Sequence, residues 1–263
     1  MSVTDDAFLG GRLNILQPRQ GYRAGLDAVM LAAAVEGRGA PCRVLDAGAG
    51  VGTAGLCVAW RCPEARVVLV EREAALVRLA EENIARNGFG DRVSVVEADV
   101  TNFTAAQLER CGLAEGSFDH VIANPPYHVE GAGTAARDDL KAAAHAMPGA
   151  QLDDWWRFLA RMAKPAGNAL MVHKASALPD MIEAAKRRFG GLVATPLFSR
   201  EGEPAHRILL GGVKGSRAEF RLDSGFAVHD AEGAFTLGAQ GVLRLGRALR
   251  VAYGTLNEAD AAP

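Results

Sequence analysis

The chain has 263 residues, a formal net charge of −2 and 49% hydrophobic residues. This composition supplies a packed core for one large α/β domain, and the near-neutral charge argues against a protein that coats nucleic acid non-specifically. No apolar run is long enough to span a bilayer, and the acidic residues 1–6 lack the pattern of a signal peptide. Cys42, Cys57, Cys62 and Cys111 form no CxxC pair and no metal-ligand spacing, which favours free thiols in a reducing cytoplasm.

The first segment is interpreted as a loop followed by a helix. Residues 13–23 are rich in Asn, Gln, Pro and Gly and are expected to be irregular. Residues 26–35 carry apolar side chains at helical spacing, with Asp27 in the first turn, where a negative charge is favourable. We expect residues 1–40 to form an N-terminal loop and helix that pack on a cofactor site, and residues 41–263 to form the main domain.

A glycine-rich turn follows a short predicted strand at residues 44–45. Asp46 and Gly48 come first, then Gly50 and Gly52, and residues 53–60 are expected to form a helix. Glycines let the backbone approach a ligand closely, and a helix N-terminus offers free N–H groups to a carboxylate or phosphate. The glycines at 50, 52 and 55 also match the GxGxxG of dinucleotide sites, but in such sites the first glycine follows the strand more closely.

Two further predicted strands lead to carboxylates. The apolar run at residues 67–71 ends in Glu71, which can accept hydrogen bonds from both ribose hydroxyls of a nucleoside. A helix at residues 73–86 and a strand at residues 93–96 lead to Asp99, which can accept a hydrogen bond from an adenine amino group, with Val100 beside it. The structural alternatives are a solvated strand-end acid for Glu71 and a turn or helix-capping acid for Asp99.

The next strand, residues 118–123, ends at Asn124-Pro125-Pro126-Tyr127, because consecutive prolines cannot continue a strand. The Asn124 side-chain oxygen and the Pro125 carbonyl, held by Pro126, can each accept an N–H from a planar amino nitrogen. These bonds favour a pyramidal nitrogen and aim its lone pair at an electrophile. Tyr127 offers an aromatic face for a planar substrate. The alternative interpretation is that the four residues are only a turn.

The alternation of strands and helices predicts a parallel sheet with helices on both faces. Asp46, Glu71, Asp99 and Asn124 should then share one edge of that sheet. Trp155 and Trp156 are expected in the core, and the histidines are interpreted as structural. The remaining elements are expected as helices at residues 134–147, 152–162 and 178–189, a turn at 164–167, a strand at 169–173, a hairpin of 192–197 with 207–213, and one strand and one helix within 226–253.

With these residues in place, the chain resembles the class I, Rossmann-like S-adenosylmethionine-dependent methyltransferases that carry the small methyltransferase domain. It looks most like the bacterial tRNA(Val) adenine-N6-methyltransferase family. The resemblance runs over nearly the whole chain and includes residues 22–28, residues 124–127 and residues 203–207. It implies a mostly parallel seven-stranded sheet with an antiparallel C-terminal hairpin. Where family members tend to have Gly-Thr-Asp, this chain has Gly25-Leu26-Asp27, so Asp27 matches and Leu26 does not.

The implied reaction is methyl transfer from S-adenosylmethionine to the N6 amino group of an adenine next to the anticodon of a tRNA. No metal, membrane or obligate protein partner is implied. The roles fall into three groups: the catalytic Asn124, Pro125, Pro126 and Tyr127; the cofactor-binding Tyr22, Asp27, Asp46, Gly48, Gly50, Gly52, Glu71, Asp99 and Val100; and the RNA-binding Arg200, His206 and Arg207, in a basic rim that also takes in Lys214, Arg217 and Arg221.

Several other functions remain open. The Asn-Pro-Pro-Tyr motif suits the side-chain amide of a protein glutamine, as in a release factor, and also an rRNA base. The literal glycine match leaves a nicotinamide-dependent oxidoreductase as a distant alternative. A non-catalytic RNA-binding module would keep the fold without consuming cofactor. A DNA methylase is less favoured, because we see no target-recognition domain in the sequence.

Overall fold

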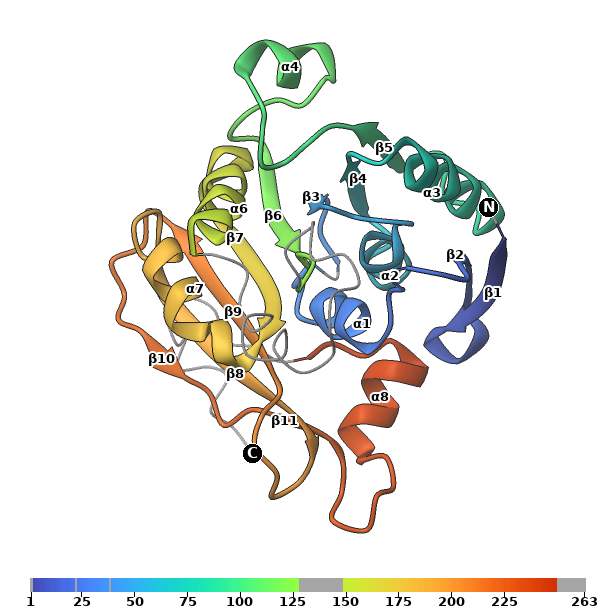
Figure 1. Cartoon of the computed structure of the whole chain (residues 1–263), viewed down its shortest axis with the longest axis vertical. Coiled ribbons are helices and arrows are strands. Elements are labelled where there is room, and N and C mark those ends of the chain that lie inside the picture. Colours follow the sequence, from blue (N-terminus) through green and yellow to red (C-terminus); the bar gives the residue numbers. More distant parts are fainter. Residues whose placement is uncertain (1, 22, 38, 128–148, 250–263) are drawn as a thin grey trace, which may run out of the picture.

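The computed structural model of the chain describes residues 2–21, 23–37, 39–127 and 149–249 (Figure 1). Tyr22 and the helix expected at residues 134–147 therefore lie outside the described residues. The strands are β1 (Val3–Phe8), β2 (Leu13–Pro18), β3 (Cys42–Ala47), β4 (Ala65–Glu71), β5 (Val93–Glu97), β6 (Phe118–Ala123), β7 (Ala163–Lys174), β8 (Phe189–Arg200), β9 (Arg207–Lys214), β10 (Arg221–Leu222) and β11 (Phe226–His229). The helices are α1 (Leu26–Ala33), α2 (Thr53–Arg61), α3 (Ala74–Arg86), α4 (Ala105–Arg110), α6 (Gly149–Met162), α7 (Leu178–Ala185) and α8 (Leu237–Leu245), with 3₁₀ turns η1 (Leu9–Gly11) and η2 (Ala175–Ala177).

The central sheet has the strand order β10-β8-β9-β7-β6-β3-β4-β5. The strands β3 to β7 run parallel, whereas β9 lies antiparallel between β7 and β8. Within the described residues the sheet has nine strands, and seven of them, β5-β4-β3-β6-β7-β9-β8, form the mostly parallel sheet with an antiparallel hairpin that the resemblance implies. The short strands β10 and β11 add a parallel edge along β8, and β10 was not predicted.

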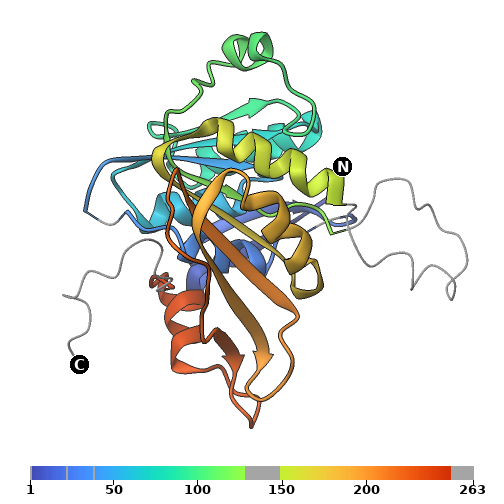
Figure 2. The ribbon, with the colours of Figure 1, turned by 90° about the vertical axis from the view of Figure 1, so that its left-hand side faces the viewer.

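Helices cover both faces of the sheet, because residues along each strand alternate between two cores. On β3, Val44 packs in a core with α1, α2 and α3, whereas Leu45 packs in a second core with α4, α6 and α7. Figures 1 and 2 show α6 and α7 on the side of the sheet away from α1 and α2. Helix α8, red in both views, contacts α1 and η1. This arrangement matches the predicted doubly covered α/β fold.

The prediction that residues 13–23 are irregular was wrong for β2, which pairs antiparallel with β1. Its polar composition does not mark a loop, because the Gln17 side chain and the backbone of Leu16 both find partners. The Gln17 side chain accepts from the Ala24 N–H at 2.8 Å and donates to the Ala24 carbonyl at 3.2 Å. The Asn83 amide on α3 bonds both the N–H and the carbonyl of Leu16, at 2.8 and 3.1 Å. Tertiary hydrogen bonds thus complete a strand that local composition disfavours.

The turn expected at residues 164–167 is a bulge within β7. Phe118 pairs with Ala163 and His120 pairs with Asn168, so four residues of β7 have no partner on β6. Pro165 is tolerated there because the bulge needs no N–H for the ladder. A Cβ on Gly167 would lie 3.0 Å from the Phe118 carbonyl oxygen, which explains the glycine.

Two further sequence expectations concern the cysteines and the membrane. None of the four cysteines, all of which the structure describes, forms a disulfide; Cys57 and Cys62 are buried, whereas Cys42 and Cys111 are half-buried. Within the described residues, every helix is too short or too polar to cross a bilayer.

Candidate active site

A cavity of about 510 Å³ lies at the carboxyl ends of β3, β4, β5 and β6. Its size falls within the roughly 300–1,000 Å³ of small-molecule sites. The topology brings Glu71, Asp99 and Asn124 into its wall, as the sequence predicts. The full lining is Gly48, Gly50, Glu71, Arg72, Glu73, Leu76, Ala98, Asp99, Val100, Thr101, Asn124, Pro126, Gln151, Asp154 and Trp155.

The glycines of the loop after β3 serve different purposes. Gly48, Gly50 and Gly52 have φ of +65°, +58° and +89°, in the left-handed region that favours glycine. A Cβ on Gly48 would collide with the ring of Trp155, and one on Gly52 would lie 2.8 Å from Leu69 Cδ1. A Cβ on Gly50 would meet nothing within 4 Å, because this residue faces the cavity. Gly50 is therefore where the backbone itself is open to a ligand.

Asp46 is 2% exposed and does not line the cavity. Its Oδ2 accepts a hydrogen bond from the Gly55 N–H at 2.8 Å, in the first turn of α2. Burial raises the pKa of Asp46 to about 7, against the lowering effect of the Gly55 N–H. Asp46, a predicted cofactor-binding residue, thus fixes the loop to the start of α2 and does not itself reach the cavity.

Glu71, 7% exposed, organises the rim of the cavity through backbone N–H groups. Its Oε2 accepts from Gly50 at 2.8 Å, and its Oε1 accepts from Arg72 and Glu73 at 2.8 and 2.9 Å. The carboxylate therefore links the glycine loop to the end of β4. A ribose bound here would meet acceptor oxygens whose positions are fixed.

Asp99 is held by Thr101, whose N–H and hydroxyl donate to Asp99 Oδ1 at 2.8 and 2.7 Å. Burial alone would raise the pKa of Asp99, but the hydrogen bonds from Thr101 and the charge of Arg72 outweigh it and lower the pKa. The carboxyl is therefore ionised at neutral pH and accepts hydrogen bonds. Leu76 and Val100 add apolar wall beside it, which suits a flat heterocycle with a polar edge.

The Asn124 motif faces the cavity with two of its four residues, Asn124 and Pro126, whereas Pro125 is buried. The Tyr127 hydroxyl lies 2.7 Å from Asp27 Oδ2 and 3.0 Å from Asn124 Oδ1. Asp27 Oδ2 also accepts from Arg207 Nε at 2.9 Å. Asp27, a predicted cofactor residue, thus contacts Tyr127 and does not line the cavity.

Comparison with known proteins decides the family. Residues 27–150 match the family model described as methyltransferase small domain. The crystal structure of a predicted O-methyltransferase, protein Atu636 from Agrobacterium tumefaciens, is 31% identical. It has a TM-score of 0.71, with 88% of this chain and 100% of that chain covered. The chain belongs to the small-domain methyltransferases.

Curated relatives of this methyltransferase include two with the same name, tRNA1(Val) (adenine(37)-N6)-methyltransferase. The protein of Aeromonas hydrophila subsp. hydrophila is 28% identical over 88% of this chain and 93% of its own length. The protein of Shewanella frigidimarina is 28% identical over 78% of this chain and 80% of its own length.

The methyl donor of this family is S-adenosylmethionine, and the cavity fits that molecule. The open Cα of Gly50 gives room for close contact with the backbone, and Glu71 presents carboxylate oxygens at the end of β4. The Asp99 carboxylate stands beside the apolar Leu76 and Val100. Carboxylate oxygens at neighbouring strand ends, beside an apolar wall, suit the hydroxyls of a ribose and the amino edge of an adenine.

The sequence prediction missed several wall residues of the methyltransferase. Trp155 was expected in the core and is 6% exposed, but its ring also covers Gly48 and lines the cavity. Arg72 and Thr101 follow strand ends and line the cavity as well. Their positions directly after Glu71 and Asp99 were the available signal, because the carboxyl ends of parallel strands share one edge.

The predicted basic rim does not gather in one place. Arg200 and His206 are exposed beside Arg207, at the end of the β8–β9 hairpin that adjoins Tyr127. Lys214 lies at the other end of β9, seven residues away, or roughly 23 Å along a strand. Its Nζ donates to the Ala163 carbonyl at 2.7 Å. RNA contact by Arg200 and His206 remains a prediction.

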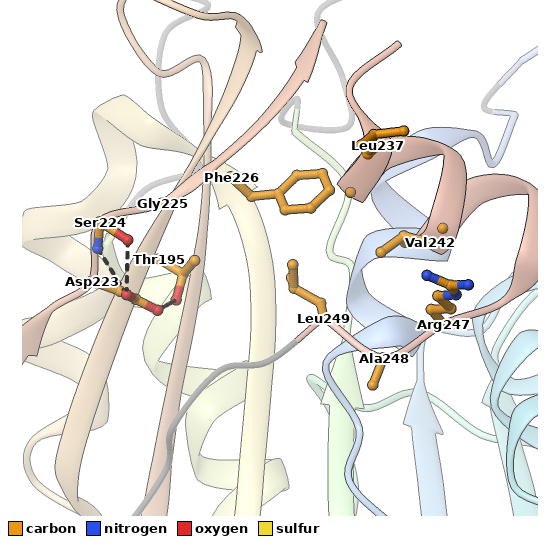
Figure 3. Close-up of a pocket in the computed structure, with 12 residues that line it drawn as sticks. Thr195, Asp223, Ser224, Gly225, Phe226, Leu237, Val242, Arg247, Ala248 and Leu249 are labelled. Carbon is orange, nitrogen blue, oxygen red and sulfur yellow. Dashed lines mark hydrogen bonds between the residues drawn. The ribbon is translucent and has the colours of Figure 1, made fainter. Parts of the chain in front are cut away.

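A second cavity, of about 420 Å³, lies between the β10–β11 edge and α8 (Figure 3). Phe226, Leu237 and Leu249 form an apolar side, and Thr195 and Asp223 lie opposite. None of the predicted catalytic, cofactor-binding or RNA-binding residues lines this cavity.

Proposed function

We propose that this methyltransferase transfers the methyl group of S-adenosylmethionine to the exocyclic N6 amino group of an adenine in tRNA, next to the anticodon. One observation carries the proposal. Asn124 and Pro126 line the same cavity as Glu71 and Asp99, so the amide of the motif faces the space that suits a nucleoside cofactor. Target nitrogen and methyl donor would therefore meet within one cavity.

The cofactor would be held by groups from four strand ends. Gly48, Gly50 and Gly52 would carry the backbone under the methionine moiety, with Asp46 fixing the loop. Glu71 would accept from the ribose, and Asp99 would accept from the adenine amino group, with Val100 against the ring. When bound, S-adenosylmethionine supplies an electrophilic methyl group on a sulfonium.

The chain's own contribution to chemistry is the orientation of the target nitrogen. The Asn124 side-chain oxygen and the Pro125 carbonyl would accept its two N–H groups and direct its lone pair. No base is needed before attack, because the nitrogen is neutral. Arg207 covers one face of the Tyr127 ring, with its guanidinium carbon 4.7 Å from the ring centroid. A target adenine would stack on the opposite face, which places the tyrosine between a cation and a base.

The amide favours nitrogen over oxygen as the methyl acceptor. A hydroxyl is a poor nucleophile until a base removes its proton, and the neutral Asn124 amide is no such base near pH 7. An amino nitrogen attacks while neutral, the sulfonium leaves as S-adenosylhomocysteine, and the methylated nitrogen then releases its proton to solvent. The structural relative from Agrobacterium tumefaciens is described as a predicted O-methyltransferase. The motif of this chain supports N-methylation instead.

Transfer RNA is proposed as the substrate because two relatives that align over most of their length are named tRNA1(Val) (adenine(37)-N6)-methyltransferase. The adenine would be flipped into the cavity, at a cost that is lower in a loop than in a duplex. Arg200 and His206 would contact the RNA backbone beside the cavity, and the reaction would take place in the cytoplasm. If they contact phosphates, tRNA binding must weaken as salt rises, because counterions are released on binding.

The direct test is transfer from S-adenosylmethionine with a labelled methyl group into unmodified bulk tRNA, followed by digestion to nucleosides. We expect the label in N6-methyladenosine. Parallel reactions with rRNA and with a release factor test the two alternative acceptors. Label in either of these and none in tRNA would refute the substrate, and cofactor binding without any transfer would indicate a non-catalytic RNA-binding module.

The Asn124→Ala variant tests the site. We expect its rate to fall by roughly 10²–10³, as on removal of one preorganised polar partner of a transition state. The dissociation constant of S-adenosylhomocysteine should change little. Asn14→Ala is the matched control, because Asn14 is an exposed asparagine on β2. A near-normal rate for Asn124→Ala, with the cofactor still bound, would refute the role of Asn124 in orienting the target nitrogen.

A further inference from the structure

The Tyr127 hydroxyl lies between two oxygen atoms and has one proton to give. Asp27 Oδ2 is 2.7 Å away and Asn124 Oδ1 is 3.0 Å away. A phenol donates one hydrogen bond, and both a carboxylate and an amide oxygen are acceptors only. The hydroxyl therefore satisfies one of these oxygens at a time, and the other faces an oxygen lone pair.

Asp27 is the stronger competitor for that proton. Its Oδ2 forms an ion pair with Arg207 Nε at 2.9 Å. Hydrogen bonds to a charged acceptor are shorter and stronger than those between neutral groups. The shorter of the two contacts is the one to Asp27. The hydroxyl proton accordingly points to Asp27, and the lone pairs of the hydroxyl oxygen point to Asn124.

The direction of the Tyr127 proton determines which atom of the Asn124 amide faces the hydroxyl oxygen. The oxygen and nitrogen of an asparagine side chain are nearly the same size and exchange places when the amide turns by half a rotation, so hydrogen bonds decide which atom faces which partner. An amide NH₂ facing the Tyr127 oxygen makes a hydrogen bond, whereas an amide oxygen there meets lone pairs.

We propose that Asp27, through the Tyr127 hydroxyl, orients the Asn124 amide so that its NH₂ donates to Tyr127 and its oxygen faces the cavity. The inference rests on the proposed function, because the oxygen then awaits the N–H of the target nitrogen. Asp27 becomes a positioning residue rather than a cofactor ligand, and Arg207 supports it rather than contacting a phosphate.

Asp27, the Tyr127 hydroxyl and the Asn124 amide form a hydrogen-bond relay, and the residues around Tyr127 hold it in place. The His173 ring lies edge-on to the Tyr127 ring, with centroids 4.9 Å apart and an interplanar angle of 73°. The Arg207 guanidinium covers one face of the same ring. Tyr127 is thus fixed by α1, β7 and β9 together. An amide turned the wrong way would offer the target N–H a second donor in place of an acceptor.

A double-mutant cycle tests the relay. Tyr127→Phe removes the hydroxyl and keeps the ring, and Asp27→Ala removes the acceptor. We expect each to lower kcat for tRNA methylation by about 10-fold, with the dissociation constant of S-adenosylhomocysteine within twofold of the parent. The double variant should be no slower than Tyr127→Phe, because both residues act through one bond. Asp27→Asn should restore most of kcat, since its amide oxygen still accepts the phenol proton.

The opposite results overturn the proposal. If the two kcat losses multiply in the double variant, or if Asp27→Ala binds S-adenosylhomocysteine more weakly, Asp27 acts on the cofactor and not through Tyr127. A normal kcat for Tyr127→Phe would remove the relay outright. Thermal unfolding of each variant identifies loss of fold, and Asp27→Asn keeps the test valid if Asp27→Ala does not fold.

A second readout needs no RNA, so it separates the relay from the proposed substrate. Protein labelled with ¹⁵N-asparagine and bound to S-adenosylhomocysteine shows the side-chain NH₂ signals, and Asn124→Ala identifies the pair from Asn124. We expect this pair to shift and lose exchange protection in Tyr127→Phe. Unchanged signals would refute the orientation even if tRNA is methylated, and a shift would support it even if tRNA is not the substrate.

Discussion

The burial of the Asp46 carboxyl predicts how the stability of the protein changes with pH. Its pKa is raised by burial from the ordinary 3.8 to about 7. Folding therefore favours the protonated form, and ionisation opposes folding. The contribution to stability is fully present below about pH 4 and is lost as the pH rises through about 7. The full difference corresponds to roughly 4 kcal/mol.

Two substitutions separate the charge of Asp46 from its hydrogen bond. Asp46→Asn removes the ionisable group and keeps an oxygen for the Gly55 N–H, which lies 2.8 Å away. Asp46→Ala removes both and leaves a buried donor without an acceptor, at a cost of about 1–3 kcal/mol. We expect Asp46→Asn to be the more stable variant by that amount at every pH.

The assay is urea unfolding of the cofactor-free protein at pH 5, 6.5 and 8. The free energy of unfolding of the parent should fall by about 2–3 kcal/mol between pH 5 and pH 8 relative to Asp46→Asn, because Asp46 ionises in the folded state over this range. Other titrating groups cancel in this difference. A difference that stays flat with pH would show that Asp46 is already ionised in the fold, and the reasoning would fail.

Three further perturbations have defined outcomes. Gly50→Ala, at φ +58° in open space, should lower stability by only about 1 kcal/mol yet raise the dissociation constant of S-adenosylhomocysteine about 10-fold by calorimetry, whereas Gly52→Ala should lose more stability because its Cβ meets Leu69. Glu71→Gln should weaken the same binding by about 10- to 100-fold, since an NH₂ then faces backbone donors; unchanged affinity would remove Glu71 from the site. Burial lowers the pKa of His173 from 6.5 to about 4, so its contribution to stability is present above pH 6.5 and is lost as the pH falls toward 4. The free energy of unfolding in urea should therefore fall between pH 7.5 and pH 5 by about 2 kcal/mol less in His173→Leu than in the parent. An equal fall in the two proteins would contradict this.

The sequence predicted the sheet well where apolar runs are dense and bounded by turn residues. Strands β3, β4, β5 and β6 are such runs, and the polar residues that follow them lie at one edge. Strand β2 escaped prediction because Asn14 and Gln17 resemble loop residues, and only pairing with β1 makes them part of a strand. The short helix α4 is not predicted from the sequence, because six residues carry too little periodicity to be recognised.

The sequence identified individual residues of the site but not the contacts among them. Asp27 and Arg207 were both selected, for the cofactor and for RNA, yet they form one ion pair across 180 positions of sequence. Gly55 matched a dinucleotide fingerprint, but a Cβ there would collide with Leu69, so that glycine allows α2 to pack on β4. Such contacts depend on which elements the fold brings together, and spacing along the chain does not contain that information.

The position of α1 depends on residues 246 and 249, near the C-terminal end of the described chain. Arg61 on α2, 3% exposed, donates to the carbonyls of Ala32 in α1 and Val35 just after it, and to that of Gly246 after α8. The Leu249 N–H donates to the Ala33 carbonyl at 2.8 Å. A nascent chain that has left the ribosome only as far as β7 lacks Gly246, Leu249 and Arg207, and therefore the bonds that these residues make. The Arg207 contact with Tyr127 can therefore form only after β9 has been synthesised, and the Leu249 bond to α1 forms later still.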